Sequence, residues 1–105
     1  MYTYFKKDKR LGILIPHVET EWSQLDNNIQ QDILLQWEQI RGSIPDRIKE
    51  LEQIINQKQH ALNHEENFSV CCRLNSEIAD TASVINDLWL WYRANQELSA
   101  ERSHT

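Results

Sequence analysis

Hydrophobic positions recur at helical spacing along most of this chain, and the clearest pattern lies in residues 67–92. That stretch contains no proline and no glycine, so nothing in it breaks a helix. One row of apolar and small residues recurs in steps of three, four or seven, as one face of a helix requires: Phe68, Cys71, Ile78, Ala82, Ile85, Trp89 and Tyr92. A second row widens the stripe: Val70, Leu74, Val84, Leu88 and Trp91. A stripe this broad needs more than one neighbour, supplied by other helices of the chain or by a second copy of it.

Two further helices are predicted earlier in the chain. Residues 18–41 carry apolar side chains at intervals of three and four: Trp22, Leu25, Ile29, Ile33, Trp37 and Ile40. Gly42 is placed to end this helix in a left-handed conformation. Ser43 and Pro45 then form a helix-start signal, in which the serine caps backbone amides. A second helix is therefore predicted over residues 44–64.

The connections between these segments are short, and short connections place successive helices antiparallel. The predicted fold is all-α, an antiparallel three-helix bundle that forms a single domain over residues 18–105. Its last helix is expected over residues 67–97, with Asn67 as its cap. Residues 1–17 are expected to form an extended N-terminal arm, in which residues 11–15 could be one short strand. A lone strand has no partner in the chain, so the arm would lie across the helices or pair with another copy.

The charge of the chain is unevenly distributed. Its net charge is −5, which argues against nucleic-acid binding over the whole surface. The first 12 residues nevertheless carry a local charge of +3, from Asp8 and four basic side chains: Lys6, Lys7, Lys9 and Arg10. This basic arm leaves open an alternative function, a small regulator that binds nucleic acid.

The candidate chemistry is sparse. Cys71 and Cys72 are adjacent, and neighbouring helical residues point about 100° apart, so they are expected to be reduced core residues in a reducing compartment. His60 and His64 have the i, i+4 spacing of metal ligands but lack a clear third ligand, so no metal and no cofactor are predicted. No apolar run approaches the roughly 18–20 residues that span a bilayer, and no secretory signal is recognised, which predicts a cytoplasmic protein. The pattern contains no catalytic constellation, and an enzyme is not expected.

Residues 67–78, NFSVCCRLNSEI, resemble the UVR motif, a short helical hairpin of interacting subunits in bacterial nucleotide excision repair and of some stress regulators. Residues 48–52, IKELE, resemble the opening of its first helix. The chain departs from the motif in a longer connection, and in Asn75 and Ser76, which replace an arginine and an aspartate. The resemblance implies a hairpin that associates with another hairpin, with seven residues at its crossing: Leu51, Ile55, Phe68, Cys71, Cys72, Leu74 and Ile78. Any amphipathic hairpin with small residues at its crossing would give a similar pattern.

Five consecutive large apolar residues, 88–92, point in every direction around the last helix. Two neighbours cannot cover them all in a small monomer, and large aromatic residues dominate binding interfaces. An interface is therefore predicted, made by Leu88, Trp89, Trp91, Tyr92 and Trp37. Trp91 is expected to face the partner, because the other three residues on this helix continue the stripes toward the chain's own core. Alternatively, the first helix and the arm cover the cluster.

The function predicted from these patterns is a non-enzymatic helical protein–protein interaction module of coiled-coil type. It is expected to self-associate, with a dimer favoured, or to bind another protein. Nucleic-acid binding through the basic arm remains the alternative.

Overall fold

The computed structural model describes the backbone of residues 4–103 and the side chains of residues 4–94. The chain is mostly helical, as the sequence predicts. It is also elongated, with principal extents of 59 × 25 × 19 Å. Its elements in order are β1 (Phe5–Asp8), β2 (Ile13–Pro16), the 3₁₀ turn η1 (Trp22–Gln24), α1 (Asn27–Gly42), α2 (Ile44–Asn63) and α3 (Phe68–Ser103).

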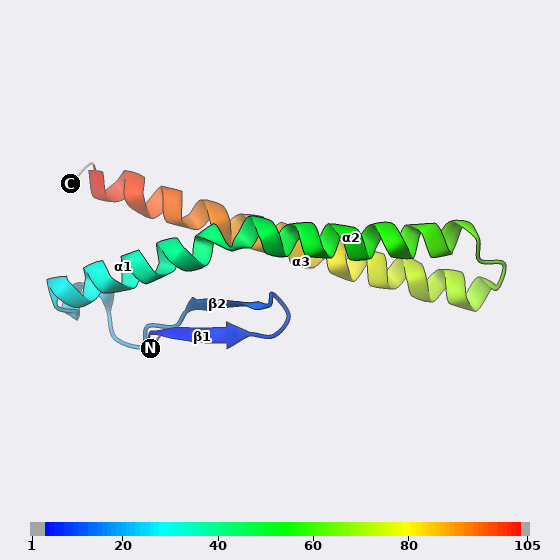
Figure 1. Ribbon diagram of the computed structural model, residues 1–105. Helices are drawn as coiled ribbons and strands as arrows, with labels where there is room; N and C mark the ends of the chain where they lie inside the picture. Colours follow the sequence, from blue (N-terminus) through cyan, green and yellow to red (C-terminus); the bar gives the residue numbers. More distant parts are fainter. Residues whose placement is uncertain (1–3, 104–105) are drawn as a thin grey trace.

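The helices form one long hairpin rather than the predicted three-helix bundle. Figure 1 shows α2 and α3 running antiparallel side by side, while α1 continues from α2 in nearly the same direction. The helix α3 therefore passes α2 and then α1, and it is antiparallel to both. The prediction that successive helices are antiparallel is therefore wrong for α1 and α2.

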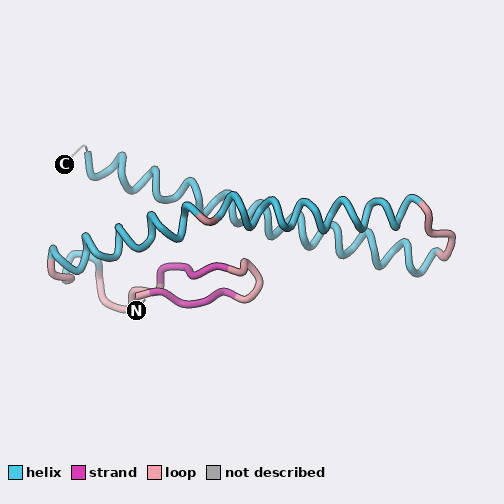
Figure 2. The backbone as a smooth tube through the Cα atoms, in the orientation of Figure 1, coloured by secondary structure: helices cyan, strands magenta, loops and turns pink. Residues whose placement is uncertain are grey.

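The reason lies at Ser43, the one residue between α1 and α2 (Figure 2). Ser43 keeps right-handed helical angles, with φ −87° and ψ −11°, so the chain bends there without reversing. Pro45 interrupts the helix because it has no N–H and its ring crowds the carbonyl four residues earlier. Gly42 belongs to α1 and has no positive φ, so the predicted left-handed stop is wrong. The Ser43 hydroxyl donates to the Ile40 carbonyl at 2.6 Å instead of capping amides, which also corrects that prediction.

Of the other helix ends, the start of α3 agrees with the prediction, whereas the end of α3 and the start of α1 do not. The Asn67 side-chain oxygen accepts a hydrogen bond from the Val70 N–H at 3.2 Å, which confirms Asn67 as the cap of α3. That helix continues to Ser103 rather than ending near residue 97. The first helix begins at Asn27, later than predicted, because the chain is still extended at Asp26 (φ −57°, ψ 144°). Short polar side chains such as those of residues 26–28 compete with helical hydrogen bonds and favour helix starts.

The N-terminal segment folds on itself as a β-hairpin, so the predicted extended arm with a lone strand is wrong. Strands β1 and β2 pair antiparallel, with Phe5 opposite Pro16 and Asp8 opposite Ile13. In the turn, the Asp8 carboxylate accepts a hydrogen bond from the Leu11 N–H at 2.9 Å. Gly12 has a φ of +77°, a conformation that glycine adopts without a steric penalty.

The core lies where this β-hairpin meets the junction of α1 and α2 and the middle of α3. Its residues come from all of these elements: Phe5, Leu11, Ile13, Ile33, Trp37, Ile40, Ile44, Ile48, Leu51, Val84 and Leu88. Ile44 and Leu88 are fully buried. Beyond this core, α2 and α3 have only each other as neighbours (Figure 1), and most of their apolar residues there are half-buried.

Candidate functional site

The aromatic cluster of α3 is divided between the core and the surface. Leu88 is fully buried. Trp91 is half-buried and packs edge-on against Trp37, with ring centroids 5.7 Å apart. Trp89 and Leu90, by contrast, are 41% and 52% exposed. The prediction that Trp91 rather than Trp89 faces outward is therefore wrong, because the β-hairpin and α1 cover the Trp91 side of the helix.

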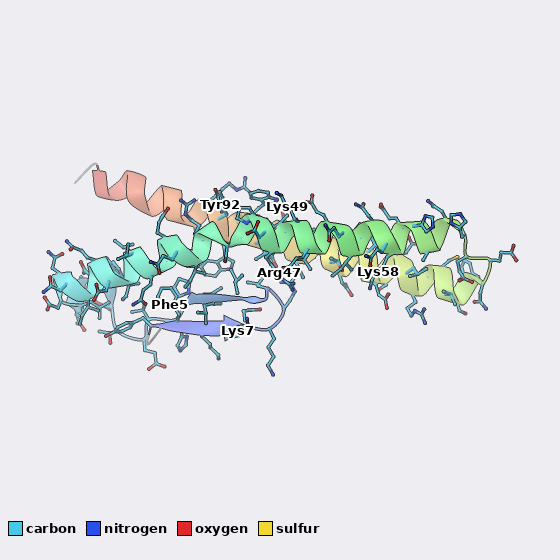
Figure 3. The ribbon with its side chains drawn as sticks, in the orientation of Figure 1. Phe5, Lys7, Arg47, Lys49, Lys58 and Tyr92 are labelled. Carbon is cyan, nitrogen blue, oxygen red and sulfur yellow. The ribbon has the colours of Figure 1, made fainter. Side chains whose placement is uncertain are left out.

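Trp89 and Tyr92 are held together beside the end of α1. Their rings meet edge to face at 5.6 Å. The guanidinium of Arg41 lies 4.7 Å from the centre of the Tyr92 ring and donates to a Glu38 carboxylate oxygen at 2.6 Å. The hydrogen bond with Glu38 raises the pKa of Arg41 above its ordinary value. Figure 3 shows Tyr92 on the side of the molecule opposite the β-hairpin.

We call one row of α3 the open face: Ile78, Ala82, Ile85 and Trp89. Ala82 and Trp89 are exposed, whereas Ile78 and Ile85 are half-buried and Ile85 packs against the core. On the opposite side of α3, Arg10 of the hairpin turn donates hydrogen bonds to Asp87 at 2.7 Å and to Ser83 at 2.9 Å. Residues two apart on a helix point about 200° apart. Ile85 lies between Ser83 and Asp87 in sequence, so it points away from the hairpin, and Trp89 lies one turn further on.

The open face borders a groove between α2 and α3. Ile85 lines this groove, which has a volume of about 520 Å³. Its other lining residues come from α2: Lys49, Glu52, Gln53, Ile55 and Asn56. Figure 3 shows Lys49 on the same side of the molecule as Tyr92. The sequence pattern of α3 indicated the apolar row, but the contribution of α2 to this side was missed because polar residues line it.

The exposed surface of α3 near the open face is nearly free of charge. Among the exposed side chains of residues 75–90, only Asp80 is charged, and it borders a different groove together with Arg10 and Ser83. The half-buried Glu77 is paired with Lys58 of α2 at 3.0 Å. Depletion of charge at a solvent-exposed surface is typical of the centre of a protein–protein interface.

The predicted hairpin crossing is assembled only in part. Leu51 and Leu74 are buried, and Ile55, Cys71 and Ile78 are half-buried. Phe68 is 81% exposed and Cys72 is exposed, so neither is a packed crossing residue. Both lie in the half of the hairpin where each helix has one neighbour, and a single neighbour covers too narrow an arc to enclose them.

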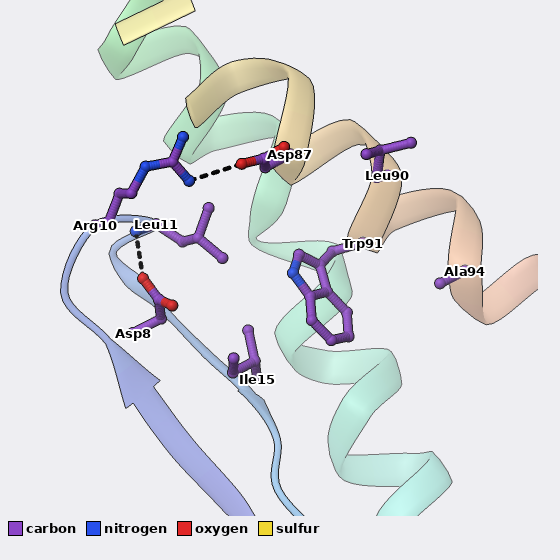
Figure 4. Close-up of a pocket in the computed structure, with 8 residues that line it drawn as sticks. All are labelled: Asp8, Arg10, Leu11, Ile15, Asp87, Leu90, Trp91 and Ala94. Carbon is purple, nitrogen blue, oxygen red and sulfur yellow. Dashed lines mark hydrogen bonds and ion pairs between the residues drawn. The ribbon is translucent and has the colours of Figure 1, made fainter. Parts of the chain in front are cut away.

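The basic residues of the predicted arm lie on β1 and in the turn of the β-hairpin. Lys6, Lys7 and Lys9 are exposed, whereas Arg10 is held by its ion pair with Asp87. A second groove of about 530 Å³ lies between the hairpin turn and α3, with Arg10 at one end and Trp91 along its wall (Figure 4).

The two histidines with metal-ligand spacing contact each other at the C-terminal end of α2. Their ring centroids are 4.5 Å apart, and Nδ1 of His64 lies 2.8 Å from the His60 carbonyl oxygen. Within the described residues, no group of three His, Cys, Asp or Glu side chains could hold a metal ion. In the same part of the chain, no helix is both long and apolar enough to cross a membrane.

Comparisons with protein-family models, with curated proteins and with solved structures find no match to this chain. A functional assignment therefore depends on the surfaces themselves. Of these, the open face combines an exposed indole with few charged side chains on α3, features that are typical of binding surfaces.

Proposed function

We propose that this chain is a non-enzymatic helical protein–protein interaction module that self-associates through the open face of α3. The observation that carries the proposal is the exposure of Trp89 at one end of an uncharged apolar row. Tryptophan is enriched among the few residues that dominate binding energy. Exposed apolar patches on soluble proteins commonly mark association sites.

The energy available from Trp89 can be estimated from its exposure. Large aromatic side chains bury about 150–250 Å², so the 41% of Trp89 that is exposed corresponds to roughly 80 Å². Complete burial of that area would contribute about 2 kcal/mol at about 25 cal/mol per Å². This amounts to about 30-fold in a dissociation constant, and a symmetric dimer would bury two such residues.

Sedimentation equilibrium on the whole chain tests this proposal. The wild-type protein should associate, and Trp89→Ala should weaken a symmetric dimer by about 30-fold for each of its two Trp89 side chains, on the order of 1,000-fold in all. Trp22→Ala is the matched control, because Trp22 is 40% exposed but lies in η1, before the start of α1. Circular dichroism should show equal helix content in all three proteins. A wild-type monomer at high micromolar concentration, or equal effects of the two substitutions, would refute the proposal.

A second candidate function is nucleic-acid binding by the lysines of the β-hairpin. The supporting observation is that Lys6, Lys7 and Lys9 are all exposed on one short element. Phosphate contacts of this kind make affinity fall steeply with salt. Replacing the three lysines with glutamine should then abolish salt-dependent binding of DNA or RNA and leave association unchanged. If the wild-type chain binds neither nucleic acid at low salt, this candidate is ruled out.

A further inference from the structure

The C-terminal end of α2 carries two histidines whose rings lie side by side. His60 and His64 are both exposed, and their ring centroids are 4.5 Å apart, with an angle of 44° between the ring planes. Residues four apart lie one above the other on the same face of a helix. Two imidazoles at this spacing can therefore bind the same metal ion.

The distance between the two rings agrees with a shared metal ion. A metal–nitrogen bond of about 2.0–2.1 Å places the centroid of an imidazole about 3.2 Å from the metal. Two rings whose bonds to the metal are about 90–109° apart, as in square-planar and tetrahedral sites, then have centroids about 4.5–5.2 Å apart. The separation of 4.5 Å between His60 and His64 lies at the lower end of this range. Rotation of the side chains can thus form the site without movement of the helix.

The hydrogen bond made by His64 leaves its other ring nitrogen available as a ligand. Nδ1 of His64 lies 2.8 Å from the His60 carbonyl oxygen. A carbonyl oxygen can only accept, so Nδ1 carries the hydrogen and Nε2 of the neutral ring has a lone pair. Metal-binding histidines commonly donate their other N–H to a backbone carbonyl in this way, which fixes the tautomer and the orientation of the ring.

The surroundings of the two rings favour a cation. The C-terminal end of a helix carries a partial negative charge, and Glu65 and Glu66 follow His64 directly. Residues 59–72 contain no lysine and no arginine. Lys58, just before this stretch, is paired with Glu77 of α3 at 3.0 Å, which offsets its charge.

We propose that His60 and His64 together bind a divalent transition-metal ion at the C-terminal end of α2. Imidazole nitrogens suit Ni²⁺, Cu²⁺ and Zn²⁺. Because both rings are exposed, water can occupy the remaining coordination positions, and the third protein ligand whose lack argued against a metal is not required. The site is separate from the proposed self-association, because it lies beside the α2–α3 turn (Figure 1), about 30 Å along α3 from Trp89.

Isothermal titration calorimetry with Ni²⁺ tests the site. Ni²⁺ does not oxidise thiols, so the whole wild-type chain is used with a phosphine reductant. One Ni²⁺ per chain should bind with a micromolar dissociation constant. His60→Gln and His64→Gln should each weaken binding by at least about 10-fold, because loss of a group that merely orients a metal ligand already costs about 10–100-fold. His17→Gln is the matched control and should bind as the wild type does, because His17 is also exposed but precedes η1 and lies 3.3 Å from Glu19.

Two further measurements locate the bound ion. An ion that binds only the folded chain stabilises it. Saturating Ni²⁺ should therefore raise the urea midpoint of the wild type and of His17→Gln, and change that of His60→Gln and His64→Gln much less. Because Ni²⁺ coordinated by imidazole and water is paramagnetic, it should also broaden the amide NMR signals of residues around 60–64.

Several results would overturn the inference. Equal dissociation constants for the wild type, His60→Gln and His64→Gln would do so, as would binding only at millimolar Ni²⁺. The thiols are the competing ligands, so Cys71→Ser combined with Cys72→Ser should leave binding unchanged. Loss of binding in that variant, or broadening centred on residues 71–72, would assign the ion to the cysteines instead. Trp89→Ala should bind Ni²⁺ as the wild type does, so failure of the metal site and failure of self-association are distinguishable.

Discussion

The two glycines of the chain should respond oppositely to replacement by alanine. Gly12 has a φ of +77°, and a Cβ atom there would lie 2.6 Å from Nε of Arg47. That same Nε donates to the Leu11 carbonyl oxygen at 3.0 Å and ties the hairpin turn to α2. Gly12→Ala must therefore strain the backbone, displace this side chain, or do both.

The expected cost follows from these two effects. A left-handed conformation costs an L-residue about 1–2 kcal/mol. Loss of the part-buried hydrogen bond from Arg47 adds about 1 kcal/mol. Alanine also restricts the unfolded chain, which offsets about 0.4–1 kcal/mol. The free energy of unfolding of Gly12→Ala should thus fall by about 2 kcal/mol.

Gly42 provides the control. It lies in the last turn of α1, and a Cβ atom there would meet nothing within 4 Å. Because alanine is about 1 kcal/mol better than glycine inside a helix, Gly42→Ala should raise the free energy of unfolding by about 0.5–1 kcal/mol. A left-handed Gly42, as predicted from sequence alone, would instead make this substitution destabilising.

Urea unfolding followed by helical circular dichroism measures both changes. All proteins should be compared at one concentration, because self-association would add to apparent stability. With m-values of about 1–3 kcal/mol/M, a change of about 2 kcal/mol moves the midpoint by roughly 1 M. The reasoning fails if Gly12→Ala is as stable as the wild type, or if Gly42→Ala is clearly less stable.

Three further predictions concern packing, ion pairing and thiol exposure. Trp37→Ala should lower the free energy of unfolding by about 3–5 kcal/mol in urea unfolding, because its ring is buried in the core; a loss below about 1 kcal/mol would contradict this. Both side chains of the Arg10–Asp87 pair are at least one-third exposed, so a double-mutant cycle should give only about 0.5 kcal/mol of coupling that weakens with salt. Salt-independent coupling above about 2 kcal/mol would show that the pair is shielded from solvent. Cys72 should react with a thiol reagent faster than Cys71, because it is the more exposed; each thiol is measured in the variant in which the other is serine. Equal reaction rates would contradict this difference in exposure.

The helices were predictable because their apolar residues recur at a helical period, and the boundaries of α2 were predicted to within a residue. The relative direction of α1 and α2 was not predictable, because the periodicity of apolar residues does not distinguish a bend between two helices from a reversal of the chain. The apolar positions nevertheless keep one phase across the break, from Trp37 and Ile40 to Ile44 and Ile48. Two helices that share one face in this way can lie end to end against a single neighbour, as α1 and α2 lie against α3.

The sequence predicted that the apolar residues 88–92 form a cluster, but not which of their side chains are exposed. Whether Trp89 or Trp91 points outward depends on which side of α3 the β-hairpin covers. That side is set by contacts between residues far apart in the sequence, chiefly the burial of Phe5, Leu11 and Ile13 against the core. The pairing of β1 with β2 was missed for a related reason. Lys6 and Lys7 interrupt the apolar character of β1, so only the second strand had a recognisable pattern.

The break at Ser43 has a mechanical consequence. Pro45 cannot donate a backbone hydrogen bond, so the direction of α1 relative to α2 depends strongly on side chains, chiefly the cluster that holds Ile44 and Leu88. The helix α3 packs against both α1 and α2 and so holds their relative orientation. If α3 detached, α1 and the β-hairpin could rotate as a unit about Ser43, while α2 kept its own hydrogen bonds. Amide protons flanking the joint should then exchange together, at the rate set by detachment of α3.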